Sequence, residues 1–253
     1  MMSKEEPILK LDTVTKNFGG VVAVDRLTMD MTRSDILGAI GPNGAGKTTV
    51  FNLITGVFPV TEGTIYFRGK PISGLKPHRI AQAGIARTYQ NIRLFESLTV
   101  YEHVQYGQFI HARSRKAKGD KAVAGKDELA EGAREILEFL GIWDLRKEYA
   151  ASLAYGQQRR VEIARALAMK PKLLLLDEPT AGMNLDEKKE ILQMMNSISE
   201  KDIAIIVIEH DMRLVMNVCS KIVMLNFGEK IVEGTPAEIS GNAKAKEVYL
   251  GKE

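Results

Sequence analysis

The residues with the clearest chemistry form a short glycine-rich run between an apolar segment and a helical one. The run reads, in order, Gly41, Pro42, Asn43, Gly44, Ala45, Gly46, Lys47, Thr48 and Thr49. It matches the phosphate-binding loop (P-loop), in which glycines let successive backbone N–H groups point at phosphate oxygens. The helix N-terminus adds partial positive charge, Lys47 would reach the β- and γ-phosphates, and Thr48 would offer its hydroxyl to Mg²⁺. The run therefore predicts a nucleotide site.

A pair of carboxylates supplies the acidic groups that such a loop needs. Four leucines at 173–176 predict a buried strand, and Asp177 and Glu178 stand where it emerges. We expect Asp177 to hold Mg²⁺ through its water shell, and Glu178 to accept a proton from the attacking water or to orient it. Taken alone, the pair is equally typical of an ordinary strand that ends in surface acids. Beside a P-loop it predicts a hydrolytic site, because parallel strands end at one edge of a sheet.

One of the four histidines stands out by its position. Residues 203–208 form a second apolar strand that ends in Glu209 and His210. The same sheet edge would direct His210 toward the γ-phosphate. We expect structural or surface roles for the other three, which are His78, His103 and His111.

The elements that must position these residues change character along the chain. Strand patterns dominate the first part, at 8–14, 21–31, 36–40 and 63–69, which favours an antiparallel sheet beside the main core. Helical spacing dominates from 99 to about 167, with one apolar stripe formed by Ala133, Ile136, Leu137 and Leu140. Strands and helices then alternate: strands at 173–176, 203–208 and 221–225, and helices from about Asp186 and from Asp211. This alternation predicts a parallel sheet with helices on both faces.

Length and composition exclude several classes of protein. The 253 residues are 45% hydrophobic and 26% charged, which is typical of a globular chain with a full core. A single cysteine, Cys219, indicates a reducing compartment, and a net charge of +3 excludes a strongly basic nucleic-acid module. The N-terminus lacks signal-peptide character, and no apolar run reaches about 18 residues. We expect a soluble cytoplasmic protein that reaches a membrane through a partner.

One basic segment departs from this neutral background. Residues 111–126 carry six Lys/Arg and one Asp, a net +5, which leaves −2 for the rest of the chain. With almost no large apolar side chain, the segment predicts a mobile loop or an exposed helix end. A solvated face is the simplest interpretation, and contact with RNA or anionic lipid stays open.

These residues, in this order, resemble the ATP-binding cassette (ABC) family of ATPases over essentially the whole chain. Gln90, within Arg87–Asn91, resembles the Q-loop glutamine, and Leu153–Gln157 stands at the family signature. His210 matches the switch histidine, and Phe18 the aromatic that stacks on adenine. The resemblance implies an α/β fold with three parts: a P-loop NTPase core with a parallel sheet, an N-terminal antiparallel β subdomain and an inserted α-helical subdomain. A single domain, 1–253, would comprise the core and β subdomain at 1–90 and 170–253, and the helical subdomain at 91–169.

The resemblance also implies how the site works. Two ATP molecules would lie in a head-to-tail dimer, between the P-loop of one subunit and the signature of the other, with Mg²⁺ held by Thr48, Gln90 and Asp177. Glu178, His210 and Gln90 would be catalytic. The signature contributes residues in trans, namely Ala154, Tyr155, Gly156 and Gln157. Gly156 and Gln157 are expected at a helix N-terminus, where free N–H groups can face a γ-phosphate.

This sequence departs from the family pattern in two places. Ala154 and Tyr155 replace the serine and first glycine of the signature, so a hydroxyl donor is missing. In the D-loop, Asn184 stands where the family has Asp, which puts an Asp-based contact across the dimer in doubt. We expect Asp186, two residues later, to cap the following helix.

The signature variant, the segment around Gln90 and the insert narrow the resemblance to the ATP-binding subunit of branched-chain amino-acid importers. A lipopolysaccharide-export ATPase is the competing interpretation, and the closing Val248–Gly251 would suit it, but its members keep Ser-Gly-Gly in the signature. Either would be peripheral on the cytoplasmic face of the membrane. Its implied partners are membrane permease subunits, a second ATP-binding subunit in a homo- or heterodimer, and, through the permease, a substrate-binding protein.

Three other classes of function remain to be separated. A soluble cassette acting on nucleic acid usually carries two cassettes or a coiled coil between them, neither of which is seen, so no nucleic-acid partner is expected. A switch GTPase needs an Asn-Lys-x-Asp base reader, which is absent, and the one Asp-x-x-Gly, Asp35–Gly38, precedes the P-loop. A P-loop kinase leaves the signature and His210 unexplained.

Overall fold

The computed structural model describes residues 6–33, 35–117 and 125–250. Its N-terminal part is an antiparallel sheet in the order β2-β1-β4-β5. The strands are β1 (Leu9–Phe18), β2 (Val21–Met31), β4 (Glu62–Phe67) and β5 (Lys70–Pro71). Buried and exposed residues alternate along the start of β1, as expected for a sheet with one buried face. This confirms the antiparallel sheet predicted beside the core.

The central sheet has six strands in the order β10-β9-β3-β8-β7-β6. They are β3 (Ile36–Ile40), β6 (Ile85–Arg87), β7 (Leu173–Asp177), β8 (Ala204–Ile208), β9 (Lys221–Asn226) and β10 (Glu229–Gly234). All neighbours pair in parallel except β9 and β10. Every residue of β3, β7 and β8 is buried, because both faces of this sheet are covered.

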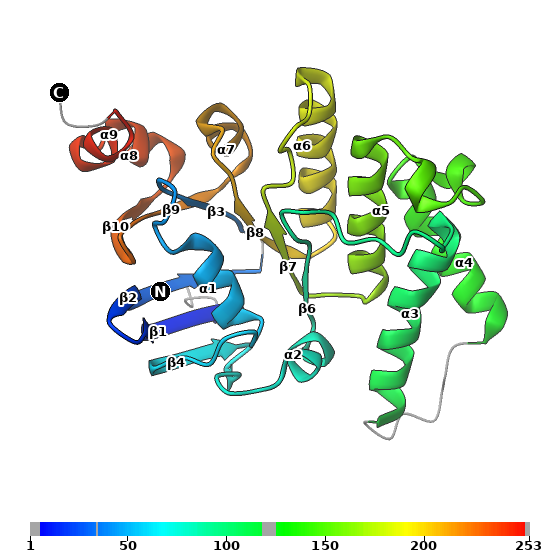
Figure 1. Ribbon diagram of the computed structural model, residues 1–253, viewed down its shortest axis with the longest axis horizontal. Helices are drawn as coiled ribbons and strands as arrows, with labels where there is room; N and C mark the ends of the chain where they lie inside the picture. The colour runs from blue at the N-terminus through cyan, green and yellow to red at the C-terminus, as the bar shows by residue number, and fades with distance from the viewer. Residues whose placement is uncertain (1–5, 34, 118–124, 251–253) are drawn as a thin grey trace, which may run out of the picture.

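The two faces of the central sheet are covered by different layers (Figure 1). Leu174 and Leu176 of β7 pack in one cluster with α6 (Leu185–Ser199), α7 (Met212–Val218) and α8 (Pro236–Gly241). Leu173 and Leu175 pack in a second cluster with α1 (Lys47–Ile54), α2 (Pro77–Ala83) and the antiparallel sheet. The prediction of helices on both faces is therefore confirmed, and α1 and α2 share the second face with the antiparallel sheet. The antiparallel sheet takes much of the second face, since its buried side also needs a partner.

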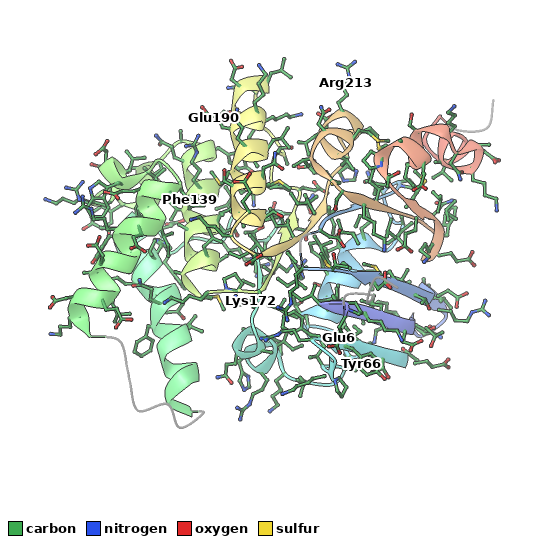
Figure 2. All side chains as sticks on the ribbon, turned by 180° about the vertical axis from the view of Figure 1, so that it is seen from behind. Glu6, Tyr66, Phe139, Lys172, Glu190 and Arg213 are labelled. Carbon is green, nitrogen blue, oxygen red and sulfur yellow. The ribbon has the colours of Figure 1, made fainter. Side chains whose placement is uncertain are left out.

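A helical unit lies between β6 and β7 in sequence and at one end of the molecule (Figure 1). It comprises α3 (Val100–Ala117), α4 (Lys126–Phe139), α5 (Tyr155–Ala168) and the 3₁₀ turns η1 (Trp143–Leu145) and η2 (Ala150–Ser152). Figure 2 places Phe139 of α4 and Tyr66 of β4 on opposite sides of Lys172, just before β7. At Gly107, α3 approaches α5 so closely that a Cβ would lie 2.4 Å from the carbonyl oxygen of Arg165.

The apolar stripe predicted for this unit is confirmed, since Ala133, Leu137 and Leu140 are buried. Within the basic segment, residues 111–117 continue α3 and Lys126 begins α4, whereas 118–124 lie outside the described residues. The chain ends in α9 (Ala243–Leu250). Among the residues that the structure describes, no helix combines the length and apolar character needed to cross a membrane.

Candidate functional site

The P-loop connects β3 to α1, and two of its glycines are required by close contacts. Gly41 has φ 147°, and a Cβ there would lie 2.1 Å from the carbonyl oxygen of Leu225. Gly46 has φ 98°, and its Cβ would lie 2.5 Å from the carbonyl oxygen of Ala23. Any side chain at either position would displace backbone. The loop is thus held against β9 and β2, with α1 beginning directly after it at Lys47.

Lys47 is buried and folds back over the loop. Its Nζ donates to the carbonyl oxygens of Gly41, at 2.8 Å, and Pro42, at 3.0 Å. Burial lowers the pKa of Lys47, while the negative charges of Glu178 and Asp177 act in the opposite direction. The ammonium group is therefore already at the loop, with the two carboxylates near enough to influence it.

Asp177 lies at the end of β7 and is 2% exposed. Its Oδ2 accepts from Nη2 of Arg87 at 2.8 Å, and the other guanidinium nitrogen donates to Asn52 on α1 at 2.6 Å. Burial raises the pKa of Asp177, and Arg87 opposes that shift. Oδ1 is buried without a hydrogen-bond partner among the described residues, so one carboxylate oxygen is left for a further ligand.

Glu178, the next residue, meets two other predicted site residues. It adopts φ 47°, a left-handed conformation that is rare outside glycine, and its N–H donates to Ile208 of β8 at 2.9 Å. Gln90 Nε2 donates to its Oε2 at 2.9 Å, and Nε2 of His210 lies 2.7 Å from its Oε1. The ends of β6, β7 and β8 thus bring Gln90, Glu178 and His210 together, as parallel neighbours allow.

Phe18 is placed at the end of β1 and is 42% exposed. Its ring meets the edge of Phe58, with centroids 5.1 Å apart, and Nζ of Lys16 lies 4.7 Å from its centroid. The ring therefore offers an exposed aromatic surface beside a cation. A core role for Phe18 is excluded by this exposure.

The four signature positions lie apart from the P-loop in this chain, since Figure 1 shows α5 and α1 well separated. Ala154 precedes the first turn of α5, and its N–H donates to Oε1 of Gln157 at 3.1 Å. Gly156 lies in the first turn, as predicted for a helix N-terminus. Tyr155 is 44% exposed, and its hydroxyl accepts from Arg159 at 3.2 Å.

The helix cap predicted at Asp186 is wrong, because Asn184 caps α6. Oδ1 of Asn184 accepts from the N–H groups of Asp186 and Glu187, each at 3.0 Å. Glu187 reciprocates by accepting from the N–H of Asn184 at 2.9 Å. Asp186 lies inside the helix, which begins at Leu185. Its carboxylate is therefore not at the N-cap position.

Several polar residues at the site were not singled out from the sequence. Arg87 carries no sequence signal beyond its place in the motif around Gln90. Helical spacing alone gives no signal that the charged pair Arg159 and Glu162 is buried. His103 is structural as expected: it is buried, and Nε2 accepts from the N–H of Phe95 at 2.9 Å. Burial lowers the pKa of His103, in keeping with a neutral ring that accepts a hydrogen bond.

Two family models match this chain. One, described as ABC transporter, matches residues 24–181, which include the P-loop, Gln90, the signature and the Asp177–Glu178 pair. The chain belongs to the ABC transporter family. The second, described as a branched-chain amino acid ATP-binding cassette transporter, matches residues 229–253. The cassette is accordingly an ATP-binding ATPase, as its motifs indicated.

Curated relatives resemble the cassette over nearly its full length. The high-affinity branched-chain amino acid transport ATP-binding protein BraF of Pseudomonas aeruginosa is 39% identical, over 97% of this chain and 98% of that protein. The lipopolysaccharide export system ATP-binding protein LptB of Haemophilus influenzae is 31% identical, over 97% and 98%.

Solved structures share the fold. The ADP conformation of an ATP-binding cassette of an ABC transporter superimposes with a TM-score of 0.86 at 32% identity, over 98% of this chain and 100% of that one. A dimeric post-hydrolysis state of another cassette, bound to ADP and Pi, gives 0.78 at 25% identity, over 90% and 98%. These likenesses confirm the predicted ABC ATPase fold.

Proposed function

We propose that this cassette hydrolyses ATP to energise the import of branched-chain or related amino acids through a membrane permease. The observation that carries the hydrolytic part is the meeting of Gln90, Glu178 and His210 beside the P-loop strand. The transport part is supported by the likeness to BraF and by the matched C-terminal family model.

ATP would be bound by residues that the fold already positions. Backbone N–H groups of the P-loop and the Lys47 ammonium would bind the phosphates, and the exposed ring of Phe18 would receive the adenine. Mg²⁺ fits the same site, because Oδ1 of Asp177 is a buried acceptor without a partner in the described chain, and Thr48 is exposed at the start of α1. Thr48, Gln90 and Asp177 would hold the ion, which neutralises charge on the β- and γ-phosphates when bound.

Hydrolysis then requires an oriented water and a proton acceptor. The water oxygen forms a bond to the γ-phosphorus, the bond from that phosphorus to the β–γ bridging oxygen breaks, and ADP retains the electron pair. Glu178 accepts the proton of the water through a carboxylate oxygen. Each of its oxygens has one partner here, Gln90 or His210, and keeps a second lone pair that can accept from the water. His210 would then hold the carboxylate or the γ-phosphate in position.

The second half of the site would come from another cassette in a head-to-tail dimer. The first turn of α5 presents Tyr155 and Gly156 at its N-terminus, with Ala154 before it, so N–H groups and the helix dipole can face a partner's γ-phosphate. The dimeric ADP-bound relative supports this arrangement. The side chain of Gln157 caps α5 and that of Asn184 caps α6. Both residues would therefore contribute to the partner's site through the helix ends that they cap.

The remaining proposals concern boundaries and partners. We retain the division into a core at 1–90 and 170–253 and a helical subdomain at 91–169, the latter docking on permease subunits. The cassette would be peripheral on the cytoplasmic face of the membrane, and a substrate-binding protein would act through the permease. Affinity purification of the assembled transporter distinguishes a second copy of this chain from a related ATP-binding subunit.

A lipopolysaccharide-export ATPase is the second candidate function, favoured by the 31% likeness to LptB. The likeness to BraF is higher, and the closing residues that suited the exporter fall in the segment matched by the branched-chain amino acid model. Affinity purification from native membranes separates the two. Co-purification of an amino-acid permease supports the import proposal, whereas lipopolysaccharide-export partners contradict it.

The hydrolytic part is tested by the conservative change Glu178→Gln. The amide keeps the size of the side chain but cannot accept the proton, so we expect ATP binding without turnover and an ATP-dependent dimer in gel filtration. Lys47→Ala serves as the contrast, because it should lose ATP binding itself. Hydrolysis by Glu178→Gln at the parental rate would show that Glu178 is not the base.

A further inference from the structure

A buried ion pair in the middle of α5 contacts the segment that carries Gln90. Arg159 and Glu162 have side chains that are 0% and 1% exposed, with Nη1 of Arg159 2.8 Å from Oε2 of Glu162. The pair is not confined to its own helix. Arg159 also donates to the carbonyl oxygen of Tyr89 at 2.7 Å and to that of Gln90 at 2.9 Å.

The contacts hold the segment 88–91, here termed the Q-loop, from both sides of its backbone. Oε1 of Glu162 accepts from the N–H of Tyr89 at 3.3 Å, while Arg159 satisfies the two carbonyl groups. The β6–β7 ladder ends just before, with Thr88 donating to Leu175 at 2.9 Å. Beyond that point the pair on α5 replaces a strand neighbour, so it determines where the backbone of Gln90 lies.

The same guanidinium reaches the signature. Its Nη2, which binds the carbonyl of Gln90, also donates to the hydroxyl of Tyr155 at 3.2 Å. Tyr155 stands where the family signature has glycine, and a Cβ on Gly182 of the D-loop would lie 3.8 Å from its ring. Arg159 thereby joins Tyr155, a side chain that the usual signature lacks, to Gln90. Gln90 in turn donates to Glu178.

We propose that Arg159 is a positioning residue that fixes the Q-loop and the signature relative to each other. The inference rests on the proposed function. In the proposed dimer, Gln90 serves the ATP bound by its own subunit, while Tyr155 and Gly156 face the ATP bound by the partner. Arg159 therefore couples the two ATP sites, and the expected consequence is cooperative ATP hydrolysis.

The test removes both charges together, in the variant Arg159→Met/Glu162→Leu. Loss of one partner alone would leave an unpaired buried charge and unfold the region, whereas apolar replacement of a buried pair is often tolerated. Arg134→Met/Glu138→Leu is the matched control, since this pair is exposed on α4 of the same helical unit and its salt bridge spans one helical turn. Urea unfolding, ATP binding, hydrolysis and hydrogen exchange are measured on all three proteins.

We expect ATP affinity to stay at the parental value, because the P-loop is untouched. Exchange of the peptide containing Tyr89 and Gln90 should become about tenfold faster. The rate constant kcat should fall about tenfold, and the Hill coefficient for ATP should fall to about 1. The control should match the parent in every measurement. Parental exchange at the Q-loop, or a parental kcat and Hill coefficient with faster exchange, would overturn the proposal.

A second variant covers the case in which the double variant does not fold. Tyr155→Phe removes only a hydroxyl from a half-exposed ring, so it should fold and lower the Hill coefficient. A parental Hill coefficient in this variant would contradict the coupling. Failure of the proposed function is recognised separately: the parent would then not hydrolyse ATP, whereas hydrogen exchange at the Q-loop tests the contact with Arg159 without any turnover.

Discussion

At the scale of single residues, the proposed base is held before any water arrives. Glu178 is turned toward Gln90 and His210 by a left-handed backbone conformation that costs energy in a residue with a side chain. The neighbouring Asp177 has one oxygen held by Arg87, and its other oxygen has no hydrogen-bond partner among the described residues. The two adjacent carboxylates thus differ in burial and in partners. Asp177 is suited to bind a metal ion, and Glu178 is suited to accept a proton.

Phe18 allows the nucleotide base to be tested apart from the phosphates. Phe18→Ala removes the stacking surface. We expect the binding free energy of ATP to weaken by about 1–3 kcal/mol, the contribution typical of a base stacked on an aromatic ring. Affinity for inorganic triphosphate should not change, since it has no base. Titration calorimetry measures both. Phe109→Ala, which removes an exposed ring on α3, is the control, and an equal loss for the two ligands would contradict adenine stacking.

Cys219 gives a second prediction at this scale. It is buried, and burial raises the pKa of its thiol to about 12. The thiolate is the reactive form, so the native protein should resist alkylation by iodoacetamide at pH 8, and unfolding in urea should expose one reactive thiol. Mass spectrometry counts the adducts. Rapid modification of the native protein would show that the region around β3 and α7 opens readily.

At the scale of elements, the sequence predicted best where a glycine or a long apolar run marks the boundary. The P-loop and strands β7 and β8 were located this way, because full burial demands unbroken apolar residues. β6 was not predicted, since a strand of three residues carries too short a pattern, although it delivers Gln90 to the site. The choice of cap for α6 failed because Asn and Asp cap equally well, and only the backbone decides which stands at the start.

That cap can be tested by comparing two substitutions. Asn184→Ala removes the acceptor for two N–H groups, so we expect a loss of about 1 kcal/mol in the free energy of unfolding, measured in urea. Asn184→Asp should retain the cap and match the parent. Asp186→Ala should cost less, since that side chain is exposed and lies inside the helix. A larger cost for Asp186→Ala than for Asn184→Ala would restore Asp186 as the cap.

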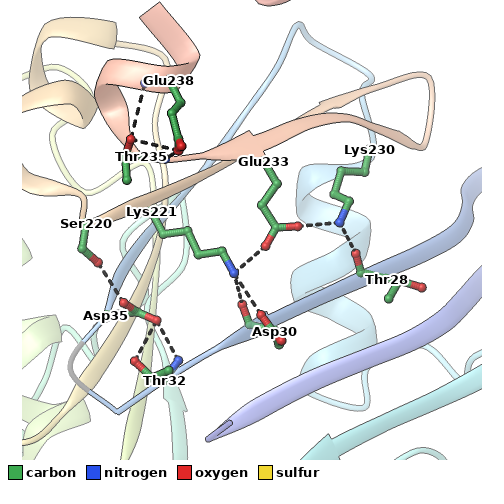
Figure 3. A network of polar contacts seen from close by, with 10 residues as sticks. All are labelled: Thr28, Asp30, Thr32, Asp35, Ser220, Lys221, Lys230, Glu233, Thr235 and Glu238. Carbon is green, nitrogen blue, oxygen red and sulfur yellow. Dashed lines mark hydrogen bonds and ion pairs between the residues drawn. The ribbon is translucent and has the colours of Figure 1, made fainter. Parts of the chain in front are cut away.

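At the scale of the whole molecule, the two sheets are joined by a polar network that no motif indicated (Figure 3). Lys221 at the start of β9 bonds Asp30 of β2 at 2.9 Å and Glu233 of β10 at 2.5 Å. The partners are as much as 191 residues apart in sequence. Hydrophobic periodicity predicted each sheet, but pairing between distant polar side chains depends on how the sheets dock, which local pattern cannot specify.

The network predicts a pH-dependent contribution of Lys221 to stability. Burial alone would lower the pKa of Lys221, but its bonds to Glu233 and Asp30 outweigh this and raise it above the ordinary 10.5. Because the pKa of Lys221 is higher in the folded protein, its contribution to stability is fully present below pH 10.5. That contribution is lost as the pH rises through the pKa of the folded state. At pH 7 the free energy of unfolding of Lys221→Met, measured in urea, should therefore be about 1 kcal/mol below that of the parent. At strongly alkaline pH the two free energies should become nearly equal.

The comparison between parent and variant isolates this one group, because every other lysine and tyrosine titrates in both proteins. Lys189→Met is the matched control: its side chain and that of its partner Asp186 are 70% and 87% exposed, so it should match the parent at each pH. A gap between Lys221→Met and the parent that stays constant from pH 7 to strongly alkaline pH would mean that packing of the lysine stem, and not its charge, holds β2 against β9.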